Sequence, residues 1–306
     1  MRIVVTGATG FIGRHLLPAL QARGATPVAL VRPTSDRSRL PAGAAAAVGD
    51  LGDADSLCRA IDGADAVVHL ASLLRVPWKP AFQSVNVEGT RRVAGACAAA
   101  GARLVVVSSL AAGPRPPVSR YGRVKRAAED AARGCCPRAV VVRPPAVFGP
   151  HDTAMLPLFR SAARGWHACP TRPASRVSMV HVGDLAAFLA GVALDPPDGP
   201  ACFYPAHEEA PAWDTLGTHL AAASGAPPPR VVYAPAAVMG ALAWGAERWG
   251  RLRDRPVPFN QDKWAEARAG DWVCDTASAT ARGWQPAPLD DRLAETARWY
   301  ADAGWL

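Results

Sequence analysis

The chain has no long apolar runs and no paired cysteine or histidine spacings. No apolar stretch approaches the roughly 20 residues that a membrane-spanning helix needs, so we expect no integral membrane segment. The first residues do not follow the charged-then-apolar plan of a secretory signal, and we expect a cytoplasmic protein. Cys135 and Cys136 are adjacent, the other five cysteines are scattered, and the seven histidines form no helical metal-binding pair. We therefore expect reduced thiols, no disulfide framework and no metal.

A basic stripe interleaved with aromatic residues is also missing. The formal net charge is +8, which raises the question of a nucleic-acid partner. However, the arginines are spread along the chain and are mixed with acidic residues. We expect no nucleic-acid partner and a small-molecule substrate, with part of the charge serving a cofactor that carries phosphates.

Short valine-rich runs alternate with helical segments in the first half of the chain. The runs are Arg2–Thr6, Pro27–Val31, Ala64–Leu70, Arg103–Val107 and Arg138–Val142. Such alternation predicts an α/β fold of the Rossmann type, a doubly wound parallel sheet with ligands at the carboxyl ends of its strands. Later, prolines become frequent and seven of the ten tryptophans fall between residues 244 and 305, which predicts a smaller, mainly helical lobe.

Two domains follow from this change of pattern. We predict a dinucleotide-binding domain of residues 1–149 and 177–200. Residues 150–176 and 201–306 would form a substrate-binding lobe. We assign the strand-helix pattern of residues 177–194 to the sheet domain, and we interpret the alanine cluster of residues 44–47 as composition bias.

Three glycines follow the first predicted strand and open a helix. Gly7, Gly10 and Gly13 have the spacing G-x-x-G-x-x-G. A diphosphate at a helix start meets free N–H groups and the positive end of the helix dipole, provided that no side chain blocks it. Gly7 permits the turn, Gly10 lets the backbone approach phosphate, and Gly13 lets the helix pack on the strand. The pattern predicts dinucleotide binding, with a tight loop that binds nothing as the alternative.

Tyr121 and Lys125 are four residues apart and would project from one face of a helix. Hydride transfer to a carbonyl needs a proton delivered to the oxygen. A neighbouring ammonium favours the phenolate and lowers the tyrosine pKa from about 10. The interval by itself fits either a catalytic pair or a surface helix pair.

The segment TGATGFIG, from Thr6 to Gly13, resembles the fingerprint of the extended short-chain dehydrogenases, the superfamily of NAD-dependent epimerases and dehydratases. Further matches follow in the expected order: Gly49-Asp50-Leu51, His69-Leu70-Ala71, Arg143-Pro144-Pro145, Val182 to Ala186, and Gly283 to Pro286. The resemblance covers essentially the whole chain. Relatives often dimerise through two helices of the sheet domain, so the resemblance implies a homodimer.

The resemblance also implies the residues of the site. Tyr121 would be the proton donor or acceptor, Lys125 would bind the nicotinamide ribose, and Ser109 would bind the substrate oxygen. The implied cofactor-binding residues are Thr6, Gly7, Thr9, Gly10, Phe11, Ile12, Gly13, Arg32, Asp50, Leu51, Leu70, Ala71, Ser72, Tyr121, Lys125 and Pro144.

The serine assignment has alternatives. Ser109 and Tyr121 are only twelve positions apart, a shorter loop than relatives usually carry, so Ser119 is a candidate substitute for Ser109. A serine at a strand end can also cap backbone groups, and we expect Ser108 in that role.

Arg32 follows the second predicted strand, where an NAD site usually offers an acid to the ribose hydroxyls. A guanidinium can bind a 2′-phosphate bidentately, whereas an acid would repel it. We therefore favour NADP(H). Asp36 is close enough in sequence to keep NAD(H) open as the alternative.

Two substitutions bear on the reaction. The asparagine by which related epimerases contact a sugar nucleotide is replaced by Ala146, and the acidic pair of related dehydratases is replaced by Leu110-Ala111. Simple hydride transfer remains, as in the dihydroflavonol reductase and 3β-hydroxysteroid dehydrogenase branch. We expect a lipophilic ketone or secondary alcohol as substrate; a nucleotide-sugar epimerase or dehydratase and a non-catalytic NADPH-binding sensor or structural subunit are the alternatives. Apolar side chains expected either at the cleft or in the core are Trp78, Phe148, Met155 and Leu156.

Residues 238–253 form an amphipathic, basic segment. Met239, Leu242, Trp249 and Leu252 lie beside Arg248, Arg251 and Arg253. Such a helix can lie on anionic lipid, so peripheral membrane contact is one interpretation. A helix of the second lobe that buries its tryptophans is the simpler one.

Overall fold

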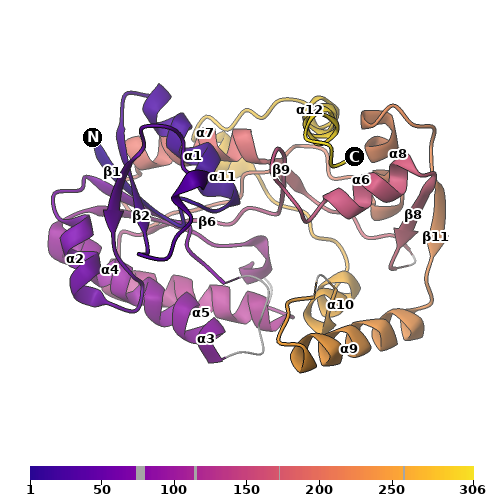
Figure 1. Ribbon diagram of the computed structural model, residues 1–306, viewed down its shortest axis with the longest axis horizontal. Coiled ribbons are helices and arrows are strands. Elements are labelled where there is room, and N and C mark those ends of the chain that lie inside the picture. The colour runs from indigo at the N-terminus through magenta and orange to yellow at the C-terminus, as the bar shows by residue number, and fades with distance from the viewer. Residues whose placement is uncertain (74–79, 114–115, 172, 258) are drawn as a thin grey trace. The chain divides into compact units, whose positions relative to one another are not determined.

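A computed structural model describes residues 1–73, 80–113, 116–171, 173–257 and 259–306 (Figure 1). The chain divides into two compact units. Unit 1 comprises Met1–Pro144 and Gly183–Tyr204, and unit 2 comprises Pro145–Val182 and Pro205–Leu306. The boundaries differ by a few residues from the sequence-based division, because strand β7 (Ala146–Phe148) pairs with β9 (Met179–His181) and both stay in unit 2.

Unit 1 is built on a seven-stranded sheet in the order β10-β6-β5-β4-β1-β2-β3, with all neighbours parallel. The strands are β1 (Arg2–Thr6), β2 (Thr26–Val31), β3 (Ala45–Val48), β4 (Ala66–His69), β5 (Arg103–Val107), β6 (Val140–Val142) and β10 (Cys202–Phe203). The strand order reverses between β1 and β4, and ligands of doubly wound sheets bind at the carboxyl ends beside such a switch point. The predicted α/β doubly wound fold is confirmed.

Helices cover both faces of this sheet (Figure 1). They are α1 (Phe11–Ala22), α2 (Ala54–Ile61), α3 (Pro80–Gln83), α4 (Gly89–Ala100), α5 (Arg120–Cys135) and α7 (Val182–Leu194), with short turns η1 (Arg37–Arg39), η2 (Ser84–Glu88) and η3 (Leu110–Ala112). Val4 and Val67 from the strands pack with Leu57 of α2 and Val93 of α4 in one fully buried cluster. The strands are nearly continuous in apolar residues because both faces are buried.

The edge strand β3 is formed by Ala45–Val48, which pair with Val28–Val31 of β2. Residues of the alanine cluster, interpreted above as composition bias, therefore make a strand. Alanine has little intrinsic preference for strands. The position of β3 depends on hydrogen bonding to β2, a pairing that the local sequence does not reveal.

Unit 2 is mainly helical and carries two small parallel sheets, β7 with β9 and β8 (Trp166–Cys169) with β11 (Arg230–Tyr233). Its helices are α6 (Leu156–Ala163), α8 (Trp213–Ala223), α9 (Ala236–Leu252), α10 (Gln261–Arg268), α11 (Ala277–Thr280) and α12 (Leu289–Asp302). Phe148, Met155 and Leu156 belong to its buried core. Of the two alternatives for these side chains, the cleft and the core, the structure shows the core. Trp78 lies outside the described residues. Within the described parts, no helix combines the length and apolar character needed to cross a membrane.

Candidate cofactor and catalytic site

The glycine loop joins the end of β1 to the start of α1. Gly7 has φ +67°, and a Cβ there would lie 2.8 Å from the backbone nitrogen of Ala71. A Cβ on Gly13 would lie 2.6 Å from the Cα of Ala8. Gly10 is the N-cap of α1 and supplies no side-chain cap. The loop is thus a backbone-lined helix start, and such a surface fits a diphosphate.

The ends of β1 and β4 are tied together by a buried chain of hydrogen bonds. Thr6 Oγ1 lies 2.8 Å from His69 Nδ1 and accepts from the Ala71 N–H at 3.1 Å. His69 Nε2 lies 2.9 Å from Thr90 Oγ1, which itself donates to the carbonyl of Asn86 at 2.6 Å. Because the Thr90 proton is used in this way, His69 donates through Nε2 and accepts through Nδ1.

His69 is therefore a neutral structural residue. Burial, with a smaller contribution from the charge of Lys125, lowers the pKa of His69 to about 3. The sequence marked His69 only as part of a motif beside the predicted cofactor residues Leu70 and Ala71. Its contact with Thr6, 63 positions away, could not be foreseen from local pattern.

Asn86 orders the segment that follows β4. Its Oδ1 accepts from Ser72 Oγ at 2.9 Å and from the Leu73 N–H at 2.8 Å, and its Nδ2 donates to the Leu73 carbonyl at 3.0 Å. Asn86 lies in the π-helical turn η2, a distortion that is frequent at functional sites. Sequence reasoning missed Asn86, although it predicted its partner Ser72.

On the other side of β1, the predicted adenosine-side residues follow β2 and β3. The Asp50 N–H donates to Ser56 Oγ at 3.0 Å, and Asp50 Oδ1 accepts from the Gly52 N–H at 2.7 Å. Arg32 follows β2 and is exposed. Asp36 accepts from both the side chain and the backbone of Ser38, and these hydrogen bonds lower its pKa.

Further arginines lie near this end of the sheet. Arg39 ion-pairs with Asp36 at 3.2 Å. Burial, and secondarily the charge of Arg39, lowers the pKa of Arg14, the residue that follows Gly13. Two guanidinium groups near one another favour an anion between or beside them. Sequence reasoning missed Arg14 and Arg39, and their positions in the chain gave no signal beyond their charge.

Helix α5 carries the predicted catalytic pair. It begins after Ser119, whose side chain accepts from the Gly122 N–H at 2.9 Å and caps the helix. Tyr121 is half-buried in the first turn, and Lys125 is buried one turn later. Lys125 Nζ donates to the carbonyl of Val107 at 2.9 Å, which places the ammonium at the carboxyl end of β5. Burial lowers the pKa of Lys125 to about 8, against an opposing effect of Glu129.

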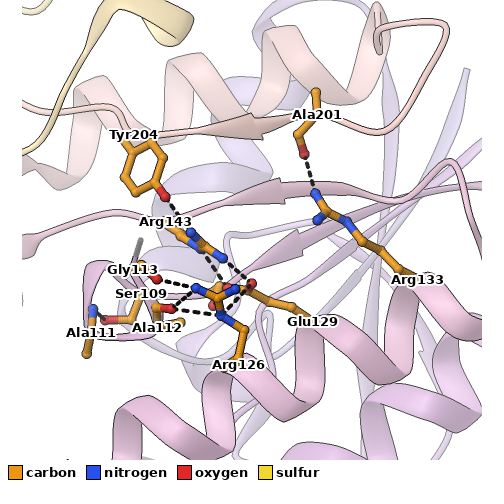
Figure 2. A network of polar contacts seen from close by, with 11 residues as sticks. Ser109, Ala111, Ala112, Gly113, Arg126, Glu129, Arg133, Arg143, Ala201 and Tyr204 are labelled. Carbon is orange, nitrogen blue, oxygen red and sulfur yellow. Dashed lines mark hydrogen bonds and ion pairs between the residues drawn. The ribbon is translucent and has the colours of Figure 1, made fainter. Parts of the chain in front are cut away.

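The two serines after β5 have different partners. Ser109 Oγ accepts from the Ala111 N–H at 3.2 Å and caps the turn η3 (Figure 2). Ser108 is buried, and its hydroxyl hydrogen-bonds the carboxylate of Glu129. The expectation that Ser108 caps backbone groups is therefore wrong. Successive side chains of extended backbone point in opposite directions, so only one of the two serines can meet α5.

A buried ionic network holds α5 against the sheet (Figure 2). Arg143, just after β6, donates to Glu129 Oε1 at 2.9 Å and to Oε2 at 2.6 Å, and its remaining terminal nitrogen bonds the hydroxyl of Tyr204. Burial by itself would lower the pKa of Arg143, but the hydrogen bonds to Glu129 raise it above its usual value. Arg126 donates to the Ala112 carbonyl at 2.7 and 2.9 Å.

This network was missed at the level of sequence, although a signal existed. Glu129 follows Lys125 by four residues, as Lys125 follows Tyr121, so all three lie on one helical face. A second predicted residue joins the same region, because the carbonyl of Pro144 accepts from the Leu110 N–H at 2.9 Å. The structure thus groups Ser109, Lys125 and Pro144 around the ends of β5 and β6, with Tyr121 one helical turn before Lys125.

Unit 2 contains a cavity of about 610 Å³ by itself. Much of its lining is apolar, including Pro170, Pro173, Tyr233, Pro235 and Trp264. The volume falls in the range of small-molecule sites. The described parts of the chain contain no group of three or more His, Cys, Asp or Glu residues placed to hold a metal ion.

Comparison with known proteins identifies the family. Residues 3–201 match the model of the NAD dependent epimerase/dehydratase family. The chain belongs to this family. The resemblance of TGATGFIG to its fingerprint is thereby confirmed, as is the expectation of an enzyme that uses a nicotinamide dinucleotide.

Among its relatives, the chain is 38% identical over 308 residues to the ceramide reductase of Caulobacter vibrioides, covering 99% of this chain and 96% of the relative. It is 31% identical over 261 residues to the 2-alkyl-3-oxoalkanoate reductase of Stenotrophomonas maltophilia, covering 74% and 77%. Among solved structures, that of gox2253 covers 99% of both chains with a TM-score of 0.79 and 25% identity.

Proposed function

We propose that this protein is an NADP(H)-dependent reductase that transfers hydride to a lipophilic ketone, with Tyr121 as the proton donor. The observation that carries the proposal is the position of Lys125, one turn after Tyr121, buried, and hydrogen-bonded to the Val107 carbonyl at the carboxyl end of β5. This end of the sheet is where doubly wound folds bind their ligands. Bound nicotinamide would supply the hydride.

The residues of the chain would supply the proton and hold the substrate. Tyr121 donates its phenolic proton to the carbonyl oxygen as negative charge develops there. Lys125 in its ammonium form stabilises the resulting phenolate; lowering a phenol pKa from about 10 to near 7 takes roughly 4 kcal/mol. Ser109 would hydrogen-bond the substrate oxygen. Its hydroxyl accepts from the Ala111 N–H and still has its own proton to donate.

The substrate class rests on the relatives and on two absent side chains. Ceramide reductase and 2-alkyl-3-oxoalkanoate reductase both act, by their names, on compounds with apolar chains. Ala146 offers no amide for a sugar nucleotide, and Leu110-Ala111 offers no acid for dehydration. Since hydride needs an electrophilic carbon, we infer a ketone on a long-chain, ceramide-like lipid. The epimerase and dehydratase alternative is disfavoured for the same reasons.

NADP(H) is favoured over NAD(H) by the charges near the adenosine end. Arg32 is exposed where an NAD site usually places an acid, and Asp36 is already occupied by Ser38 and Arg39. Arg14 and Arg39 add positive charge close to the glycine loop. A 2′-phosphate would meet guanidinium groups here instead of a carboxylate.

For the compartment and the assembly we propose what we expect from the sequence, a cytoplasmic homodimer. None of the seven cysteines, all of which lie in the described residues, forms a disulfide, as is usual in a reducing compartment, and we infer a cytoplasmic location. A homodimer formed through helices of unit 1 is expected by analogy with relatives.

The test is NADPH oxidation with purified protein and a panel of ketones that includes a 3-oxo long-chain amide, a 3-oxo fatty acid and a nucleotide-linked 4-keto sugar. We expect turnover of the long-chain ketones, and a loss of at least about 100-fold in kcat for Tyr121→Phe, the range typical of a lost proton donor. Tyr300→Phe, in the core of unit 2 and outside the residues that line its cavity, is the matched control. Full activity of Tyr121→Phe would remove the proposed proton donor. Tight NADPH binding without turnover of any ketone would favour the alternative of a non-catalytic NADPH-binding sensor or structural subunit.

A further inference from the structure

Helix α9 of unit 2 turns an apolar face to solvent. Val238, Leu242, Trp249 and Leu252 have 49%, 57%, 57% and 81% of their surface exposed. The intervals of four, seven and three residues place them on one side of the helix. The sequence left open whether this helix buries its tryptophans, and the structure shows that Trp249 is mostly exposed.

The opposite face of α9 packs inside unit 2, mostly through small residues. Ala243, Glu247 and Gly250 are buried. A Cβ on Gly250 would lie 2.8 Å from the carbonyl oxygen of Arg255, and one on Gly240 would lie 3.2 Å from Trp264 Nε1. The glycines therefore let the helix pack closely against its neighbours, while its largest apolar side chains stay exposed. A helix whose outer face met only water would bury its large apolar side chains and expose its polar ones.

Arginines frame the exposed apolar face. The guanidinium of Arg253 lies 4.4 Å from the ring centroid of Trp249, and that of Arg248 lies 5.7 Å from that of Trp244, which is itself 57% exposed. Arg251 ion-pairs with Glu247. Glu247 is the only acidic residue of α9 and is buried, so the exposed side of the helix itself carries positive charge alone.

We propose that this exposed face of α9 docks the protein on the surface of an anionic lipid bilayer. Trp249 has the apolar body and polar N–H that suit the headgroup boundary. Leu242 and Leu252 enter the outermost acyl region. Arg248 and Arg253 keep their charge at the level of the phosphates while their methylenes lie along the apolar face.

A second copy of the chain is a poorer occupant of the same face. Two such helices placed face to face would bring Arg248, Arg251 and Arg253 of one copy against those of the other, and Asp254 is the single exposed acid between residues 236 and 255 that could compensate. Anionic phosphates provide the charge that complements this surface. The docking goes beyond the proposed reaction, and its test needs neither cofactor nor substrate.

The experiment is flotation of the full-length protein with vesicles. One set contains phosphatidylcholine with about 30% phosphatidylglycerol, and the other contains phosphatidylcholine alone. We expect flotation with the anionic vesicles, a loss of at least about tenfold when salt is raised from 0.05 to roughly 0.5 M, and weak flotation with the neutral vesicles.

The decisive variant is Leu242→Ser combined with Trp249→Ser, and we expect it to lose at least about tenfold in flotation. Trp166→Ser is the matched control, because Trp166 is 49% exposed on β8, away from α9 in the sequence. Arg248→Gln combined with Arg253→Gln tests whether the positive charge beside the apolar face contributes to flotation with the anionic vesicles. Far-ultraviolet circular dichroism and urea unfolding verify that the variants are folded.

Three results would overturn the proposal. The first is equal flotation of the wild type and the Leu242→Ser, Trp249→Ser variant. The second is equal flotation with neutral and anionic vesicles. The third is a dimer seen by sedimentation that this variant abolishes, in a wild type that does not float, which would assign the face to a second copy. Flotation is measured without ketone reduction. A failure of the docking proposal can therefore be told apart from a failure of the proposed reductase function.

Discussion

Lys125 Nζ donates a hydrogen bond to the carbonyl oxygen of Val107 at 2.9 Å. This contact joins the middle of α5 to the last residue of β5 and holds the ammonium where the sheet opens toward a ligand. The position of Lys125 is therefore set by the backbone of the sheet, independently of a bound cofactor.

The alkaline side of the pH profile should report on Lys125. Burial lowers its pKa from 10.5 to about 8 in the folded protein. As pH rises through about 8, the folded enzyme loses the ammonium, so we expect kcat/KM for ketone reduction to fall above that pH. In Lys125→Arg the positive charge persists to higher pH, so any remaining activity should no longer fall above about pH 8. A wild-type profile that stays flat to pH 10 would contradict the assignment.

The same shift has a consequence for stability. Between about pH 8 and 10.5 the unfolded chain binds the Lys125 proton while the folded protein does not. The free energy of unfolding from this group therefore rises with pH across that window. Urea unfolding of the cofactor-free protein at pH 8 and pH 10, compared with Lys125→Met, isolates the contribution.

His69 should make the protein sensitive to acid. Its pKa is lowered from 6.5 to about 3, so between these values the unfolded state binds the proton and the folded state does not. Stability from this group is complete above pH 6.5 and declines as pH falls, by about 2 kcal/mol at pH 5. We expect His69→Gln to be less stable at pH 7 but to show a smaller loss between pH 7 and 5. Parallel stability curves for the two proteins would exclude this role.

Glu129→Gln should destabilise the fold strongly. The variant keeps the size of the side chain but leaves the buried guanidinium of Arg143 without its charged partner. Removing one member of a buried ion pair costs about 3–5 kcal/mol. Glu88→Gln is the control, because Glu88 forms an exposed ion pair with Arg91 on unit 1 and its removal should leave the urea midpoint unchanged. Similar midpoints for Glu129→Gln and the wild type would show that the network does not hold α5.

Gly13→Ala should weaken the dinucleotide site. The added Cβ would lie 2.6 Å from backbone atoms of Gly7 and Ala8, so the glycine loop itself has to shift. We expect NADPH to bind at least about tenfold more weakly, which is about 1.4 kcal/mol. Gly95→Ala on α4 meets no atom within 4 Å and should bind NADPH normally, with a gain in stability of about 0.5–1 kcal/mol. Isothermal titration with NADPH checks both, and unchanged affinity in Gly13→Ala would argue against diphosphate binding at this loop.

Arg32→Asp should shift the preference from NADPH toward NADH. Loss of a charged hydrogen bond to the 2′-phosphate costs about 1.5–3 kcal/mol, a factor of roughly 10 to 150, and the introduced carboxylate adds repulsion. The measurement is the ratio of kcat/KM for the two cofactors. Arg103→Asp, at the amino end of β5, is the control and should keep the wild-type ratio. Equal ratios in Arg32→Asp and the wild type would return the assignment to NAD(H).

The amino-acid sequence by itself determined the α/β class, five of the seven strands of the main sheet, and the spacing of Gly7 to Gly13. These features are local: apolar runs report burial on both faces of a strand, and the spacing of glycines reports a turn before a helix. The four-residue interval of Tyr121 and Lys125 likewise fixed their common face, because the period of a helix is a property of the backbone.

Only the tertiary structure decided which distant residues meet. It made a strand of Ala45–Val48 by pairing it with β2, joined Thr6 to His69 across 63 positions, and placed the Glu129 carboxylate between Ser108 and Arg143. It also decided which side of α9 is buried, since Gly240 and Gly250 fit against their neighbours and Trp249 does not. Such pairings depend on the packing of chain segments far apart in sequence, and no local periodicity encodes them.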